Sequence, residues 1–292
     1  MGKTALMKWN CSAEVFSYSH AISAEVFEEW NEKLGKNLDS PIMYHSINEL
    51  ERRFYLHFYL PESVGIEDTE IRAYMMGTSL VMALNIASPG AHIWWPPSVI
   101  LPKFNIEHTN PKIMLGKAFK LFTDRKIDQN QLLDKKVLRR AEMLWPALIE
   151  IMNTQDRMFF NYMKGMNLWT IGHSEINYFE ETFMCFWKAL ERFITTEYTK
   201  SGKRLKKDEL LKVMGEVLPS TFYGEEIRGE IGQLYNLRGS TIAHSVGKEK
   251  RITNEEVGKI KLFADLFMFK VLMKRSTENF AKLEKEVGIV SD

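Results

Sequence analysis

Apolar residues recur at helical spacing along most of the C-terminal half of the chain. The clearest segment runs from Phe179 to Tyr198, where large apolar side chains repeat every three or four residues. That period places them on one side of a helix, so the sequence predicts a helix with a wide buried stripe. The residues of the stripe are Phe179, Phe183, Phe186, Trp187, Leu190, Phe193 and Ile194.

Further helices are predicted on both sides of this segment. Residues Leu132 to Asn153 have the same period, and Pro146 would kink or break that helix. Another helix is expected over Ser220 to Leu237. The last predicted helix should begin at Thr253, because the Thr253–Glu256 spacing is typical of a capping box, and it should extend through the charged tail.

The N-terminal segment has a different pattern. Residues Glu51 to Leu60 are rich in aromatic and branched side chains and stop at Pro61, which predicts a strand. Thr69 to Ala87 is predicted to be a helix capped by Thr69 and ended by the breaker at residues 88–90. Its expected apolar positions include Ile71, Met75 and Leu80.

Two tryptophans, Trp94 and Trp95, precede a pair of prolines in the same half. They fit either a binding surface or a loop wedged against the core, and burial is the more frequent outcome for such rings. Proline and glycine become sparse from about residue 128. We therefore expect a mixed α+β domain over residues 1–127, a helical domain over residues 128–292, and a mostly α chain.

Composition limits the functional classes. A formal net charge of +1, with 45% hydrophobic and 26% charged residues, is that of a globular protein without a global field for nucleic acid or membrane. Its two cysteines, Cys11 and Cys185, form no metal-binding pattern, and the histidines lack metal-ligand spacing. We expect no metal, no cofactor, no membrane segment and, without a signal-peptide profile, a cytoplasmic location.

An arginine and a histidine stand six positions apart in the segment from Tyr235 to Ser245. The guanidinium of Arg238 is a permanent planar cation that can hold a phosphate through paired hydrogen bonds. The imidazole of His244 can accept and donate a proton near neutral pH. Together they supply the groups needed to cut RNA without a metal ion.

Helix geometry restricts how this pair can act. Positions six apart on a straight helix are rotated by about 120° and separated by roughly 9 Å along the axis. Two arrangements bring Arg238 and His244 onto one phosphate. The segment can bend at Gly239–Thr241, whose residues are mediocre helix formers, or a two-fold dimer can bring one pair from each chain into a shared cleft.

The C-terminal half resembles the HEPN superfamily, in particular its Apea-like branch. Two segments carry the resemblance, the helix motif Phe183-Met-Cys-Phe-Trp-Lys-Ala-Leu-Glu191 and the later Arg238-x5-His244 motif, about fifty residues apart. The resemblance covers roughly residues 130–285. It implies an antiparallel helical bundle that forms a homodimer through this domain.

Many HEPN proteins are metal-independent RNA endonucleases, often toxins or antiviral-defence effectors with a regulatory or antitoxin partner. The resemblance implies that His244 is the acid–base group and that Arg238 holds the scissile phosphate, leaving a 2′,3′-cyclic phosphate. Glu191 is expected either to orient the histidine or to cap the polar edge of its helix. Gly239 replaces a residue that is often polar in active members, so Ser240 is the candidate for that contact, and Val246 replaces a tyrosine found in some.

Basic residues near the motif are candidates for RNA binding. Lys248, Lys250 and Arg251 follow His244 closely and are placed to attract the substrate. A second basic group at residues 200–207 fits either an RNA-backbone contact or a solvated linker between helices.

Two alternatives to the nuclease remain open. Other HEPN domains have lost activity and serve as modules for protein or nucleotide binding. The Arg238–His244 spacing is also compatible with coincidence in an unrelated helical regulatory protein. The different composition of residues 1–127 suggests a sensor or regulatory domain, and no ligand is assigned to it.

Overall fold

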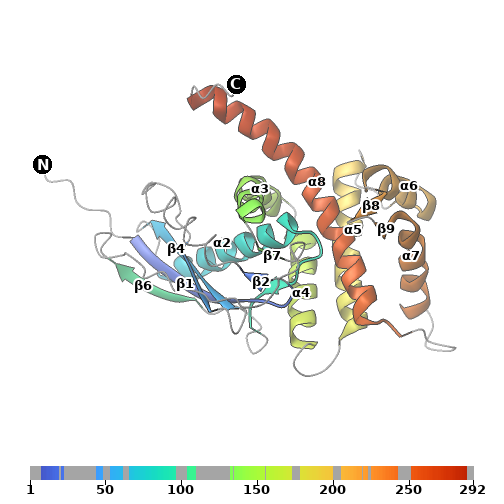
Figure 1. Cartoon of the computed structure of the whole chain (residues 1–292), viewed down its shortest axis with the longest axis horizontal. Helices are drawn as coiled ribbons and strands as arrows, with labels where there is room; N and C mark the ends of the chain where they lie inside the picture. The colour runs from blue at the N-terminus through green and yellow to red at the C-terminus, as the bar shows by residue number, and fades with distance from the viewer. Residues whose placement is uncertain are drawn as a thin grey trace, which may run out of the picture. The chain divides into compact units, whose positions relative to one another are not determined.

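The computed structural model of the chain divides into two compact units, Met1–Glu142 and Met143–Asp292. The predicted boundary between residues 127 and 128 lies outside the described residues, and the observed division falls inside a helix. The structure describes residues 8–19, 21–22, 44–48, 53–61, 66–96, 104–109, 132–133, 135–154, 156–172, 178–199, 205–218, 220–222, 225–242 and 251–287. These residues are mostly helical (Figure 1).

The N-terminal unit contains an antiparallel five-stranded sheet with strand order β3-β4-β1-β5, in which β6 also pairs with β1. Strand β1 is central: β4 pairs along one edge, while β6 and β5 pair with the two ends of the other. The bounds are β1 Lys8–Ser17, β3 Tyr44–Asn48, β4 Arg53–Pro61, β5 Ile93–Trp94 and β6 Asn105–Thr109. The predicted strand over residues 51–60 is confirmed as β4. A short parallel pair, β2 (Ala21–Ile22) with β7 (Leu132–Leu133), lies apart from this sheet.

One face of the sheet is apolar because side chains alternate along each strand. On β1, Cys11, Ala13 and Val15 are buried, and on β4, Phe54 and Leu56 are buried. Helix α2 (Ile66–Ala87) contacts β1 and β4 and accounts for much of the unit's core. The sheet and α2 therefore form two layers.

The predicted start of α2 is wrong, and its predicted end is confirmed. The helix begins at Ile66, and Thr69 is buried inside it instead of capping it. Leu80 is in the core as expected, whereas Ile71 and Met75 are exposed by 64% and 40%. The chain leaves the helix through Gly90, whose φ of 87° is a conformation that glycine adopts without strain.

Trp94 and Trp95 belong to the core, being 2% and 1% exposed. Buried Asn85 of α2 fixes this segment by bonding the backbone of Ile93 in both directions: its Nδ2 donates to the Ile93 carbonyl, and its Oδ1 accepts from the Ile93 amide. The binding-surface interpretation of the two tryptophans is therefore wrong. Asn85, a polar residue within the apolar part of α2, therefore holds the Ile93 segment against the helix.

Helix α3 (Lys135–Thr154) begins later than predicted, because Leu132 and Leu133 form β7. Pro146 lies inside the helix without ending it. Residues 143–154 of α3 are the first part of the C-terminal unit. Helix α4 (Asp156–Gly172), which the sequence pattern did not single out, follows directly.

Helix α5 (Phe179–Tyr198) has the predicted bounds and forms the centre of the C-terminal unit. Figure 1 shows α4, α5 and α8 (Asn254–Val287) running alongside one another, and α5 packs on both of the others. The predicted apolar stripe of α5 is buried apart from Phe179, which is half-buried. At the α4–α5 contact, a Cβ on Gly165 would lie 2.9 Å from the Phe186 ring, so the two helices approach closely only because residue 165 is glycine.

A fully buried polar network joins α4 to α8. Tyr162 donates a 2.6 Å hydrogen bond to Asp265 Oδ1, and Lys261 Nζ lies 2.5 Å from Asp265 Oδ2. Burial lowers the pKa of Lys261, which the Asp265 carboxylate opposes, whereas burial and then Asp265 raise the pKa of Tyr162 well above its ordinary value. Near the start of α8, Trp169 Nε1 donates to Asn254 Oδ1 at 2.8 Å.

The start of α8 confirms the predicted capping box. The Thr253 amide donates to Glu256 Oε2 at 2.8 Å, and the Glu256 amide donates to Thr253 Oγ1 at 3.3 Å. The helix extends through the charged tail to Val287, as expected. Among the helices that the structure describes, none has the length and apolar content needed to cross a membrane.

The region between α5 and α8 differs from the prediction. Residues Lys207–Val217 form helix α6, which the sequence analysis did not predict. The helix expected from Ser220 begins only at Arg228, because β8 (Thr221–Phe222) and β9 (Glu225–Glu226) first form a small hairpin. Helix α7 then runs over Arg228–Ile242.

The close approach at Gly165 predicts that two glycine substitutions have opposite effects on stability. Gly165→Ala should lower the free energy of unfolding by about 1–3 kcal/mol, because its methyl group overpacks against Phe186. Gly215→Ala in α6 is the matched control: nothing lies within 4 Å of its added Cβ, so better helix propensity should stabilise by up to about 1 kcal/mol. Urea unfolding followed by circular dichroism measures both, and equal shifts would contradict the packing argument.

The Lys261–Asp265 pair predicts a non-additive double variant. Lys261→Met leaves a buried carboxylate without its ammonium partner and should cost about 3–5 kcal/mol of unfolding free energy. Adding Asp265→Asn removes that uncompensated charge, keeps an acceptor for the Tyr162 hydroxyl and should recover part of the loss. Urea unfolding followed by tryptophan fluorescence provides the measurement, and a double variant less stable than Lys261→Met would contradict a dominant ion pair.

Candidate functional site

Arg238 lies near the last described turn of α7, beside the apolar face formed by Ile231, Leu234 and Leu237. Its side chain is only 20% exposed. The guanidinium carbon lies 5.5 Å from the ring centroids of both Trp187 and Tyr235. Such contacts attract a cation to the aromatic faces, so the two rings fix the position of the guanidinium.

The two rings also link α7 to α5. Trp187 of α5 and Tyr235 of α7 meet edge to face, with centroids 5.7 Å apart. Lys207 of α6 adds to the same cluster, since its Nζ lies 5.2 Å from the Tyr235 centroid and 3.2 Å from Asn236 Oδ1. The position of Arg238 thus depends on packing between helices that are far apart in sequence.

Glu191 of α5 is an acidic group beside Arg238. Its Oε1 lies 3.8 Å from Arg238 Nη1, which is an ion pair but too long for a hydrogen bond. In the part of the chain that the structure describes, no residue accepts a hydrogen bond from the Arg238 guanidinium. Most of its donor capacity therefore remains available to a ligand.

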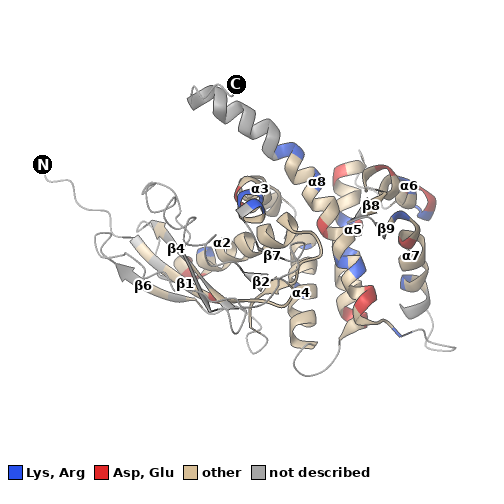
Figure 2. Ribbon diagram, in the orientation of Figure 1, with Lys and Arg blue, Asp and Glu red and all other residues tan. Residues whose placement is uncertain are grey.

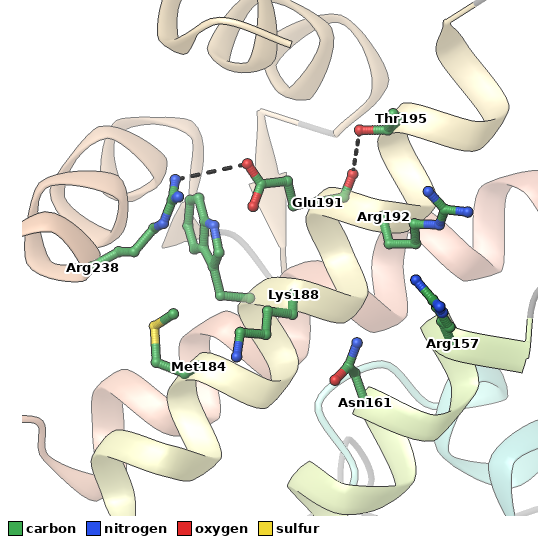
Figure 3. Close-up of a pocket in the computed structure, with 9 residues that line it drawn as sticks. Arg157, Asn161, Met184, Lys188, Glu191, Arg192, Thr195 and Arg238 are labelled. Carbon is green, nitrogen blue, oxygen red and sulfur yellow. Dashed lines mark hydrogen bonds and ion pairs between the residues drawn. The ribbon is translucent and has the colours of Figure 1, made fainter. Parts of the chain in front are cut away.

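Arg238 and Glu191 line a hollow of about 490 Å³. Figure 3 shows that it lies among α4, α5 and α7, with Arg238 on one side and Arg157 and Arg192 on the other. The lining residues are Arg157, Asn161, Met184, Trp187, Lys188, Glu191, Arg192, Thr195 and Arg238. Four of these nine are basic and one is acidic, so the hollow is locally positive although the chain is nearly neutral.

Two predicted site residues are thus brought together, while others lie outside the described residues. Arg238 and Glu191 share the hollow, and Arg251 is exposed just before α8. His244, Lys248 and Lys250 fall outside the residues that the structure describes, as does the side chain of Ser240. The convergence of Arg238 and His244 therefore remains a prediction.

Helix α7 contains the three residues at which a bend was proposed. Gly239, Ser240 and Thr241 are helical, and α7 continues through them to Ile242. Because His244 lies outside the described residues, both the bend and the two-fold dimer stay predictions for how His244 reaches Arg238.

The hollow contains basic residues that the sequence interpretation did not select. Lys188 and Arg192 are on α5, one turn apart and on either side of Glu191. Arg157 is on α4, a helix that was not predicted. The spacing of Lys188, Glu191 and Arg192 indicates a charged helix face, but only packing of the helices places Arg157 against it.

Charges of both signs are distributed over α5, α6 and α7 (Figure 2), so the positive hollow is a local feature. The basic group at residues 200–207 is divided by the fold. Lys206 precedes α6 and Lys207 contacts α7, while Lys200, Lys203 and Arg204 fall outside the described residues. Neither described lysine lines the hollow.

The comparisons with known proteins assign no family to the chain. Comparisons with protein-family models, with curated proteins and with solved structures each find no match. The HEPN resemblance therefore remains a prediction based on the residues themselves.

The aromatic contacts predict an energetic coupling between Arg238 and Tyr235. In a double-mutant cycle of Arg238→Met and Tyr235→Leu, the coupling in unfolding free energy should be about 0.5–1 kcal/mol, as for a partly exposed cation–π contact. Pairing Arg238→Met with Lys212→Met on α6, whose side chain is 77% exposed, should give a coupling near zero. Urea unfolding measures both cycles, and equal couplings would contradict the contact.

Proposed function

We propose that the chain is a metal-independent RNA endonuclease whose C-terminal unit is an Apea-like HEPN domain. The observation that carries the proposal is the position of Arg238 in a hollow whose lining has four basic residues and one acidic residue. Strands of RNA are polyanions, so a local cationic hollow concentrates them and holds a phosphate. Arg238 is fixed by two aromatic rings, which reduces the entropy lost when it grips that phosphate.

In the proposed reaction, Arg238 binds the scissile phosphate and His244 transfers protons. A base takes the proton of the 2′-hydroxyl, the 2′-oxygen attacks phosphorus, and the bond to the 5′-oxygen breaks as that oxygen is protonated. The products are a 2′,3′-cyclic phosphate and a 5′-hydroxyl end. Arg238 stabilises the charge that builds on the phosphate oxygens, an effect that is usually large.

Other residues take supporting roles in this proposal. Glu191 lies close enough to orient the Arg238 guanidinium, and Ser240 is the candidate polar group beside the motif. Lys248, Lys250 and Arg251 would attract the RNA strand. A homodimer through the HEPN domain would bring two pairs to one cleft, and the N-terminal unit would regulate activity in a toxin or antiviral-defence role with a regulatory or antitoxin partner.

A non-catalytic HEPN module is the second candidate function. The same four cations, at Arg157, Lys188, Arg192 and Arg238, would bind the phosphates of a nucleotide without any bond being broken. Such a module needs Arg238 for binding but has no use for proton transfer by His244. The two functions therefore differ in what His244 contributes.

Cleavage of a mixed RNA pool in EDTA tests the nuclease. His244→Ala should lower the rate by about 10²–10⁴-fold because it removes the proton shuttle. Arg238→Ala should lower it by about 10²–10³-fold because it removes charge stabilisation. Gel analysis gives the rates, and end-group analysis of the fragments should find the cyclic phosphate.

The control variant is Lys212→Ala, which removes an exposed basic residue of α6 outside the hollow and should retain full activity. Circular dichroism checks that each variant is folded. An intact RNA pool after incubation with folded wild-type protein would reject the nuclease and favour the binding module. Equal activity of wild type and His244→Ala would reject the assigned proton shuttle.

A further inference from the structure

The side of the hollow opposite Arg238 has its own cationic group. Arg157 at the start of α4 and Arg192 on α5 both line it, and Figure 3 shows them on the side away from Arg238, with Lys188 between. Lys188 and Arg192 are one helical turn apart, roughly 6 Å along the axis. Like charges at this spacing repel, so a bound anion would relieve a cost that the fold otherwise carries.

The side near Arg238 contains an unused hydrogen-bond donor. Trp187 lines the hollow and is only 1% exposed, and no described residue accepts a hydrogen bond from its Nε1. An indole N–H is a donor only, and a buried donor without a partner costs about 1–3 kcal/mol. Because the ring also contacts the Arg238 guanidinium, this donor and the guanidinium belong to one end of the hollow.

We propose that the hollow is a two-ended phosphate site for a ligand with at least two phosphate groups. Arg238 and the Trp187 N–H hold one phosphate, Arg157 and Arg192 hold the second, and Lys188 lies between them. The proposal rests on the proposed function in one respect: the phosphate at Arg238 is taken to be the scissile one. The second subsite, at Arg157 and Arg192, extends that function to a neighbouring phosphate.

The chemistry of the lining favours phosphates over bases or apolar groups. Arg157, Lys188 and Arg192 are exposed cations, and guanidinium groups match phosphate oxygens with paired donors. The faces of the Trp187 ring are taken by the Arg238 guanidinium and by Phe183, which stacks on it, so the ring would contribute its N–H and would not stack on a base. Both a phosphodiester strand and a free linear polyphosphate present such neighbouring phosphates.

Equilibrium binding with two probes tests the site on the full chain in EDTA. The probes are a labelled single-stranded RNA whose 2′-hydroxyls are methylated, which prevents cleavage, and inorganic tripolyphosphate as a competitor. The double variant Arg157→Gln/Arg192→Gln should lose at least about tenfold in affinity, as expected for hydrogen bonds to charged groups. Its slope of log affinity against log salt for the strand should shrink by about 1.4, or 0.7 for each lost contact.

The matched control is Lys212→Gln/Lys274→Gln, which removes two exposed charges of the same unit outside the hollow and should leave affinity and slope unchanged. Trp187→Phe keeps an aromatic ring beside Arg238 but removes the N–H. It should weaken binding about two- to tenfold without changing the salt slope, because the lost donor is neutral. Circular dichroism and thermal unfolding confirm that the variants are folded.

The outcomes separate the possible ligands. Weaker strand binding by Arg157→Gln/Arg192→Gln identifies a phosphodiester strand, whereas weaker tripolyphosphate binding alone identifies a free polyphosphate. Wild-type affinity and salt slope for both probes in this variant would overturn the two-ended site.

The outcomes also distinguish this site from the nuclease. A strand that binds as expected while unmodified RNA stays uncut would reject the nuclease and leave the site intact. Cleavage by a double variant that binds like wild type would retain the nuclease and reject the second subsite.

Discussion

Helix α5 has to bury a wide apolar stripe, and the arrangement of the C-terminal unit follows from how that stripe is covered. Helices α4 and α8 pack on it, and Trp187 extends the contact to α7 through Tyr235. Burying these faces leaves the polar remainder of α5, with Lys188, Glu191 and Arg192, at the hollow. The hydrophobic effect thus determines which charged side chains face the candidate ligand.

Electrostatics and packing act against each other at this hollow. Four basic side chains and one carboxylate line this space, and the like charges repel one another. Aromatic faces compensate at Arg238, where two rings contact the guanidinium. The apolar contacts of α5 therefore hold several like charges close together.

The parts of the fold that were predictable from sequence have strong local signals. The 3.6-residue period of α5 and the Thr253–Glu256 capping box gave correct boundaries because periodicity and capping act within a few residues. The start of α2 was wrong because Thr69 resembles a cap but is buried by tertiary packing. Helix α4 also has a buried period, which Gly165 and the exposed Phe160 obscure.

The candidate site was also predictable only in part. Arg238 and Glu191 follow from their chemistry and from the resemblance, and the structure brings them together. Arg157 was missed because it lies about thirty residues before Lys188 and Arg192 and on a different helix. No local pattern records that proximity, since it arises only when α4 packs on α5 through Gly165.

Helix α3 has a practical consequence for dissecting the chain. The division between the units falls between Glu142 and Met143, within the continuous helix Lys135–Thr154, and buried side chains occur on both sides of the cut, at Leu138 and Leu144 among others. A fragment starting at Met143 would begin in mid-helix, without the first two turns of α3, and a shortened helix is less stable. Separate expression of the halves should therefore keep this helix whole, because a cut inside it would unwind its new end whatever the biochemical role of either half.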